Sequence, residues 1–154
     1  MLPAQSWDMI RARQRRATNP GENTIAGRER RFDEYADFLR TFVHQLNQLA
    51  EEGWAVLVEG KRDAAAMRGL GYTGGLVTVS AVSKLGSRAL FPAKKVVILT
   101  DLDREGRILA SRFIKLLSHD GIRTSLSERR RLRAASRGAF RHIENLSRFS
   151  ETDV

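Results

Sequence analysis

Apolar and polar positions follow two different periods along the chain, and these predict helices and strands in turn. Between residues 28 and 51, apolar side chains recur at three- and four-residue steps and Gly53 follows, which predicts an amphipathic helix. The period changes at "WAVLVE", residues 54–59, where a continuous apolar run is typical of a strand covered on both faces. A similar run predicts a strand at residues 94–100, and two further strands are expected at residues 76–80 and 122–127.

Helical patterns fill the intervals between these strands. Helices are expected at residues 61–70, in short form within 81–90, at 103–118 and at 128–149. The third of these is expected to bury Ile108, Leu109, Phe113, Leu116 and Leu117, and the last Leu132, Phe140, Ile143 and Leu146. Strands that alternate with helices predict an α/β fold, in which helices flank a parallel four-stranded sheet, with an added N-terminal helix and a basic C-terminal helix.

Composition narrows the class of partner. The 154 residues carry a formal net charge of +9, which favours a polyanion, with nucleic acid first and an anionic membrane second. No apolar run is long enough to span a membrane, and the first residues lack the charged-then-apolar order of a secretory signal. We therefore expect a cytoplasmic protein with no membrane partner. Nothing in the sequence predicts an oligomeric state.

The absence of cysteine restricts the kind of metal that the chain can hold. Disulfides and thiolate sites are excluded, and the three histidines show no metal-ligand spacing. A metal here is expected to be a hard cation held by oxygen.

One glycine motif has two interpretations. "GLGYTG", residues 69–74, has the letters of a dinucleotide-binding fingerprint, which must follow a strand and open a helix. Here it follows a predicted helix and precedes a predicted strand. We therefore favour the second interpretation, in which the glycines end the helix and turn the chain.

Acidic residues gather after two of the predicted strands. Glu59 ends the first strand, and Asp101 and Asp103 follow the third, in "TDLDREG". Ligands of parallel α/β sheets bind outside the carboxyl ends of the strands, so these carboxylates converge if the two strands are neighbours. Three such carboxylates suit Mg²⁺, with Mn²⁺ as a substitute. The alternative is that Asp103 caps the following helix and nearby arginines neutralise the acids.

Basic residues lie close to these acids and along the C-terminal tail. Lys61, Arg62 and Arg104 are expected to hold phosphate oxygens near the metal. The tail arginines are either a solvated helix face or phosphate contacts, and arginine with few acids nearby favours phosphate. They are Arg129, Arg130, Arg131, Arg133 and Arg137. "RARQRR" near the N-terminus is a second candidate arm, whereas Phe32, Tyr35 and Phe38 are expected in the core.

Two motifs together resemble a known family. "VLVEGKRD", followed about forty positions later by "LTDLDREG", is similar to the Toprim domain of type IA topoisomerases, primases and related proteins. The likeness is strongest to small stand-alone archaeal Toprim proteins and to the 5S ribosomal RNA maturase. It implies a Rossmann-like Toprim fold over residues 54–127, with Glu59 in proton transfer, Asp101 and Asp103 on Mg²⁺, and Glu105 as a further ligand.

The resemblance leaves several functions open. We expect a Mg²⁺-dependent endonuclease that acts on structured RNA or on DNA, with a role in RNA processing favoured. The alternative is a non-catalytic module that binds RNA or a ribonucleoprotein and uses the acids to hold a bridging metal. A third, weaker interpretation is a phosphoryl-transfer domain. Topoisomerase and primase activities are not expected, because the chain lacks a strand-passage gate and a cysteine zinc module.

These inferences divide the chain into four parts. Residues 1–27 are expected to be an irregular basic segment and residues 28–53 the N-terminal helix. Residues 54–127 form the expected Toprim domain, and residues 128–154 the basic C-terminal helix and tail.

Overall fold

The computed structural model describes residues 24–150, so the predictions made for "RARQRR" and for the last four residues lie outside it. The chain divides into two units, residues 1–34 and 35–154. The described part of the first unit is the beginning of α2 (Ile25–Glu51). This helix begins before the predicted residue 28, because the Thr24 hydroxyl oxygen accepts a hydrogen bond from the Gly27 N–H at 3.1 Å and caps it.

The second unit is built on a four-stranded parallel sheet. Its strands are β1 (Trp54–Val58), β2 (Leu76–Thr78), β3 (Lys95–Ile98) and β4 (Arg123–Ser125), in the order β2-β1-β3-β4. Val56 pairs with Leu76 on one side and with Val97 on the other. The predicted parallel sheet is therefore confirmed. Because β1 and β3 are neighbours, Glu59 and Asp101 leave the sheet at adjacent positions.

Helices lie between these strands and after the last of them. They are α3 (Lys61–Gly69), α4 (Val79–Leu85), the 3₁₀ helix η2 (Gly86–Leu90), α5 (Arg104–His119), α6 (Ser127–Ser136) and the 3₁₀ helix η3 (Ile143–Phe149). The predicted strand 76–80 ends early, because the Thr78 hydroxyl oxygen accepts a hydrogen bond from the Ala81 N–H at 3.3 Å and starts α4.

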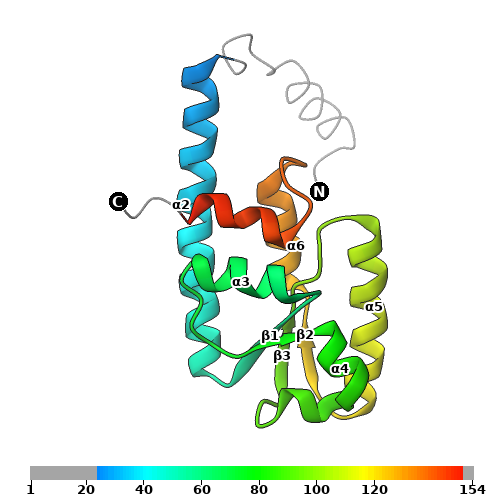
Figure 1. Ribbon diagram of the computed structural model, residues 1–154. Helices are drawn as coiled ribbons and strands as arrows, with labels where there is room; N and C mark the ends of the chain where they lie inside the picture. The colour runs from blue at the N-terminus through cyan, green and yellow to red at the C-terminus, as the bar shows by residue number, and fades with distance from the viewer. Residues whose placement is uncertain (1–23, 151–154) are drawn as a thin grey trace, which may run out of the picture. The chain divides into compact units, whose positions relative to one another are not determined.

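Helices cover both faces of the sheet (Figure 1). Val56, Val58 and Val97 pack with residues of α2, α3, α6 and η3. The alternate residues Ala55 and Leu57 pack on the other face with α4, η2 and α5. Successive strand side chains point to opposite faces, so a strand buried on both sides is apolar at every position. This explains the continuous apolar runs in the sequence.

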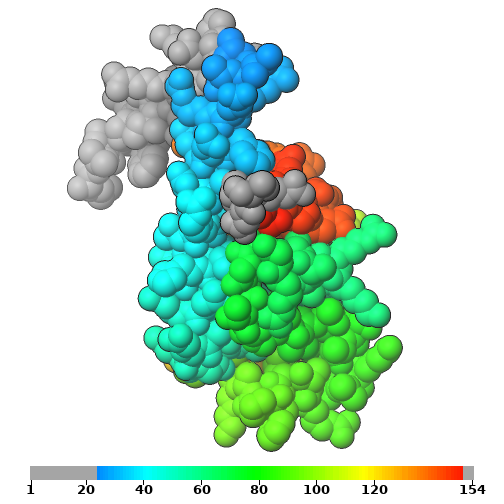
Figure 2. All heavy atoms as spheres, turned by 60° about the vertical axis from the view of Figure 1, so that its left-hand side comes forward, coloured from blue at the N-terminus to red at the C-terminus, as the bar shows by residue number. Residues whose placement is uncertain are grey.

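The predicted helix over residues 128–149 is wrong as a single element. α6 stops at Ser136, and Arg137 and Gly138 adopt left-handed conformations with φ of 48° and 79°. The chain therefore turns back, and residues 139–149, which we call the return segment, lie against α3 (Figure 2). Phe140, Ile143 and Leu146 are still buried, as predicted.

α5 buries a narrower stripe than the sequence predicted. Ala110, Phe113 and Leu117 are buried, whereas Ile108 is 57% exposed and Leu116 is 39% exposed. The buried positions recur at three- and four-residue steps and form one face toward the sheet. Ile108 and Leu116 lie beyond that face.

The "GLGYTG" segment forms a turn between a helix and a strand. Leu70 caps α3, and Gly71 has a φ of 98°, which glycine adopts at little cost. A side chain at Gly74 would overlap the hydroxyl of the buried Tyr72. The interpretation as helix end and turn agrees with this geometry.

Across residues 24–150, we found no helix with the length and apolar character needed to cross a membrane.

Candidate metal centre

A short acidic loop, residues 100–103, links β3 to α5. The Asp103 carboxylate caps α5 by accepting a hydrogen bond from the Gly106 N–H at 2.7 Å. The buried Thr100 hydroxyl donates to the Gly106 carbonyl at 2.6 Å. A Cβ at Gly106 would overlap the Asp101 carbonyl, so only glycine permits this close turn. The loop thus holds Asp101 and Asp103 at the carboxyl edge of the sheet.

Glu59 meets this loop from β1. Its carboxylate accepts a hydrogen bond from the Asp101 N–H at 3.0 Å, so the residues predicted to converge do lie together. Burial raises the pKa of Glu59, the Asp101 hydrogen bond opposes that rise, and the charges of Asp101, Asp63 and Asp103 add to it. Several carboxylates therefore crowd one edge, where a cation is favoured.

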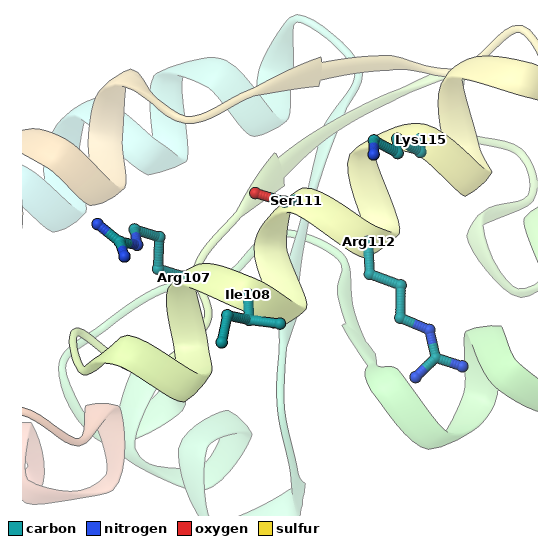
Figure 3. A pocket seen from close by; sticks show the side chains of 5 residues that line it. All are labelled: Arg107, Ile108, Ser111, Arg112 and Lys115. Atoms are coloured by element: carbon teal, nitrogen blue, oxygen red, sulfur yellow. The ribbon is translucent and has the colours of Figure 1, made fainter.

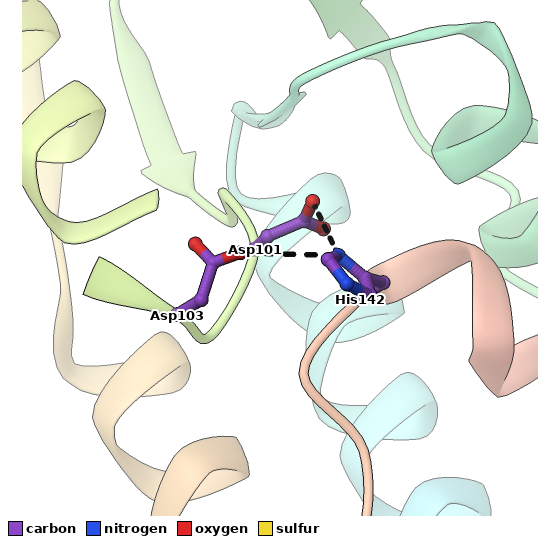
Figure 4. A group of neighbouring side chains, drawn as sticks. All are labelled: Asp101, Asp103 and His142. Atoms are coloured by element: carbon purple, nitrogen blue, oxygen red, sulfur yellow. Dashed lines mark hydrogen bonds and ion pairs between the residues drawn. The ribbon is translucent and has the colours of Figure 1, made fainter. Parts of the chain in front are cut away.

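His142 contributes the group that the sequence did not predict. Its Nδ1 lies 3.1 Å from one carboxylate oxygen of Asp101 and 3.9 Å from one of Asp103 (Figure 4). The hydrogen bond to Asp101 raises the pKa of His142. The histidine stands 41 positions from Asp101 and shows no ligand spacing with it. Only the turn after α6 brings the two together.

The return segment is bound to the acidic residues through its backbone. The Ile143 N–H donates to the second carboxylate oxygen of Asp101 at 2.9 Å, and the Glu144 N–H donates to Asp63 at 3.0 Å. Asp63, in "VEGKRD", also accepts from the Gly60 N–H at 3.0 Å. It is 7% exposed, and burial is the main cause that raises its pKa. Sequence reasoning missed this carboxylate, whose place in the first turn of α3 was the available signal.

Arg129 requires a correction. It was expected to contact phosphate from the outer face of the tail helix with the other tail arginines, but it is 5% exposed and burial lowers its pKa. Its guanidinium donates to the carbonyls of Thr100 at 3.2 Å, Asp101 at 2.6 Å and Asp103 at 3.4 Å. These bonds use its Nε and Nη2 donors within the acidic loop. Arg129 therefore supports that loop and does not present its charge to a ligand.

The other predicted site residues lie on the surface. Glu105 is exposed in the first turn of α5 and lies outside the group formed by Asp101, Asp103 and His142. The exposed basic residues are Lys61, Arg62, Arg104, Arg130, Arg131, Arg133 and Arg137. Among them, Arg131 lies over the Phe42 ring, 5.5 Å from its centre. Tyr35 and Phe38 pack against the core as predicted, whereas Phe32 is 36% exposed.

The donor set fits a divalent cation. Asp101, Asp103 and His142 each offer one ligand atom, and these atoms lie within 4.8 Å of one another. Carboxylate oxygens suit Mg²⁺ and Mn²⁺, while imidazole nitrogen suits transition metals. Mn²⁺ accepts both kinds of ligand.

The sequence of this chain is similar to that of known proteins. The Toprim domain family matches residues 54–129. A UPF0292 protein of Methanosarcina acetivorans is 33% identical over 104 residues, which cover 66% of this chain and 72% of that protein. UPF0292 protein MJ1624 of Methanocaldococcus jannaschii is 32% identical over 122 residues, which cover 75% of this chain and 92% of that protein.

A solved structure supports the fold. A protein from Aquifex aeolicus superimposes with a TM-score of 0.57 at 23% identity, over 68% of this chain and 94% of that one. Together, the Toprim match and the Asp–Asp–His group are consistent with a metal-binding domain related to nucleic-acid function. The chain belongs to the UPF0292 protein family and contains a Toprim domain at residues 54–129.

Proposed function

We propose that this chain binds nucleic acid and cuts phosphodiester bonds in structured RNA or in DNA with the help of Mg²⁺ or Mn²⁺. The observation that carries the proposal is the 3.0 Å hydrogen bond between the Asp101 N–H and Glu59, which holds a proton-transfer group against a candidate metal ligand. The net charge of +9 supports a polyanionic substrate.

Each residue has a distinct role in this proposal. Asp101, Asp103 and His142 would hold the ion, which when bound would stabilise the charge that develops on a scissile phosphate. Glu59 would accept a proton from the attacking water or give one to the leaving oxygen. The exposed Lys61, Arg62 and Arg104 would orient phosphate oxygens. Glu105 is not required, because it lies outside the group.

RNA is the favoured substrate on the strength of the resemblance to the 5S ribosomal RNA maturase. The phosphodiester chemistry is the same for DNA, so both polymers belong in the assay. Sequencing the nucleic acid that crosslinks to the purified protein would identify the substrate directly.

A second candidate function rests on the return segment. Both carboxylate oxygens of Asp101 have protein partners, the Ile143 N–H and the His142 ring. Through these two bonds Asp101 holds the C-terminal part of the chain in place, and the same carboxylate is a candidate ligand for a bridging ion. The second candidate is therefore a non-catalytic RNA- or ribonucleoprotein-binding module.

Three substitutions separate the two candidates. Glu59→Gln keeps the shape and the acceptor oxygen but removes proton transfer, so cleavage should fall by about 10²–10⁴-fold while nucleic-acid binding persists. Asp101→Asn should abolish cleavage by weakening the metal site. Glu105→Gln, a matched change at an exposed carboxylate, should cut like the wild type. The assay follows divalent-dependent cleavage of structured RNA and of single- and double-stranded DNA.

A measurement of metal binding completes the test. Mn²⁺ binding, followed by electron paramagnetic resonance, should be weaker in Asp101→Asn and His142→Ala and retained in Glu105→Gln. If the wild type binds nucleic acid but cuts none of these substrates with either ion, the nuclease proposal is wrong and the binding module takes its place. If Glu59→Gln cuts at the wild-type rate, Glu59 does not transfer the proton.

A further inference from the structure

The outer side of α5 carries a row of exposed cations. Arg104, Arg107, Ser111 and Lys115 follow one another at steps of three or four residues, so they share one side of the helix. Arg112 and Ile108 occupy the neighbouring row (Figure 3). The side chains of Arg107, Ile108, Ser111, Arg112 and Lys115 line an open hollow of about 520 Å³.

The cations of α5 have no ion-pair partner within the described chain. None of the ion pairs found among residues 24–150 involves Arg107, Arg112 or Lys115. Glu105 is the one carboxylate among residues 104–119, against two arginines and a lysine in the hollow. Arg129 contrasts with them, because carbonyls of the acidic loop use its donors. The α5 cations are thus available to an external anion.

The row also begins at the candidate metal centre. Asp103 is the N-cap of α5, so the row leads away from the proposed site of cleavage. From Arg104 to Lys115 the helix rises about 16 Å, at 1.5 Å per residue. The row is therefore long enough to contact several consecutive phosphates of one strand. Ile108, 57% exposed, adds an apolar surface for sugar or base.

We propose that the exposed side of α5 is a track for the phosphodiester backbone, along which a nucleic-acid strand reaches Asp101 and Asp103. The nature of this ligand rests on the proposed function. The position of the track is an independent claim, because it depends on the free cations of α5 and not on the metal or on Glu59.

The test compares two triple variants of equal charge. Arg107→Ala, Arg112→Ala and Lys115→Ala together remove three exposed cations from α5. Lys84→Ala, Arg88→Ala and Lys94→Ala remove three exposed cations from α4, η2 and the segment before β3. Binding to fluorescent single-stranded RNA, single-stranded DNA and duplex DNA is measured in EDTA across a salt series, and circular dichroism checks folding.

The α5 variant should lower the slope of log K against log salt by about 2–3, since each lost phosphate contact removes about 0.7–0.9. Its affinity near 0.15 M salt should fall by roughly tenfold or more. The matched variant should stay close to the wild type, and equal effects of the two variants would overturn the track. If the wild type itself binds none of the three polymers, the proposed function fails and the track fails with it. The three polymers also show whether the track prefers RNA or DNA.

Discussion

Arg129 shows how one buried residue sets the position of the carboxylates. Its guanidinium donates to three carbonyls of the acidic loop, and Arg129→Ala would remove this donor from the carbonyls of Thr100 and Asp101. The Asp103 carbonyl would keep its hydrogen bond from the Arg107 N–H. An unsatisfied buried polar group costs about 1–3 kcal/mol, so we expect a loss of about 2–4 kcal/mol in the free energy of unfolding, with weaker Mn²⁺ binding. Urea unfolding and Mn²⁺ titration measure both effects.

The neighbouring Arg130→Ala is a matched control for that experiment. Arg130 is exposed, and surface substitutions usually change stability by less than about 0.5 kcal/mol. If the two variants are equally stable and bind Mn²⁺ equally, the supporting role of Arg129 is wrong.

Tyr72 gives the protein a specific sensitivity to alkaline pH. The side chain is 1% exposed, its hydroxyl donates to the Gly75 carbonyl at 3.1 Å, and burial raises its pKa to about 12. Between pH 10 and 12 the unfolded chain loses this proton while the folded chain keeps it. The unfolding free energy therefore decreases as pH rises, by up to about 2–3 kcal/mol.

The variant Tyr72→Phe isolates this contribution. It keeps the ring and removes the ionisable group, so its stability should decrease less than that of the wild type between pH 10 and 12. Urea unfolding at intervals of half a pH unit makes the comparison. Parallel pH profiles for the two proteins would rule out Tyr72 as the cause.

At the scale of elements, the return segment connects the core to the candidate metal centre. Leu146 is fully buried in the same core cluster as Val58 and Val97 of the sheet, while His142 contacts Asp101 from the same segment. Leu146→Ala should cost about 2–5 kcal/mol of unfolding free energy, the usual range for a buried leucine. Because the segment also positions His142, we expect Mn²⁺ affinity to fall as well.

Asn145→Ala is the control, because that side chain is exposed one position before Leu146. Chemical unfolding and Mn²⁺ titration on both variants test the connection. A Leu146→Ala protein that loses stability but binds Mn²⁺ as the wild type does would show that the segment stabilises the core without organising the site.

For the whole molecule, the carboxylates at one edge of the sheet should make stability depend on divalent ions. An ion that binds only the folded state stabilises it by about 2.7 kcal/mol at a concentration of 100 times Kd. For a chain of this size that corresponds to a rise of about 5–10 °C in Tm. Thermal unfolding with Mn²⁺ and with EDTA measures the difference.

Asp101→Asn should lose most of this stabilisation by Mn²⁺. The rise in Tm should persist in Glu105→Gln, whose carboxylate lies outside the Asp–Asp–His group. A rise of equal size in Asp101→Asn would place the stabilising ion elsewhere on the protein.

The sequence by itself determined most of the fold and part of the candidate site. Continuous apolar runs identified the central strands β1 and β3, and the alternation of strands with helices implied a parallel sheet, because these patterns arise from local periodicity and from the handedness of crossovers. The carboxyl ends of parallel strands lie at the same edge of a sheet, and this placed Glu59, Asp101 and Asp103 at one edge. The structure brings Glu59 and Asp101 together there. The local order of apolar, polar and acidic residues was sufficient for these conclusions.

Only the tertiary structure decided the roles of Arg129 and His142. Whether Arg129 faces water or the acidic loop depends on how α6 packs beside β3. The pattern of apolar and polar residues around Arg129 does not predict this packing. The position of His142 depends on the left-handed conformations of Arg137 and Gly138, which break the expected helix and return the chain to Asp101. Contacts between residues so far apart in the chain are set by packing of the whole core, and the sequence pattern near each residue does not contain them.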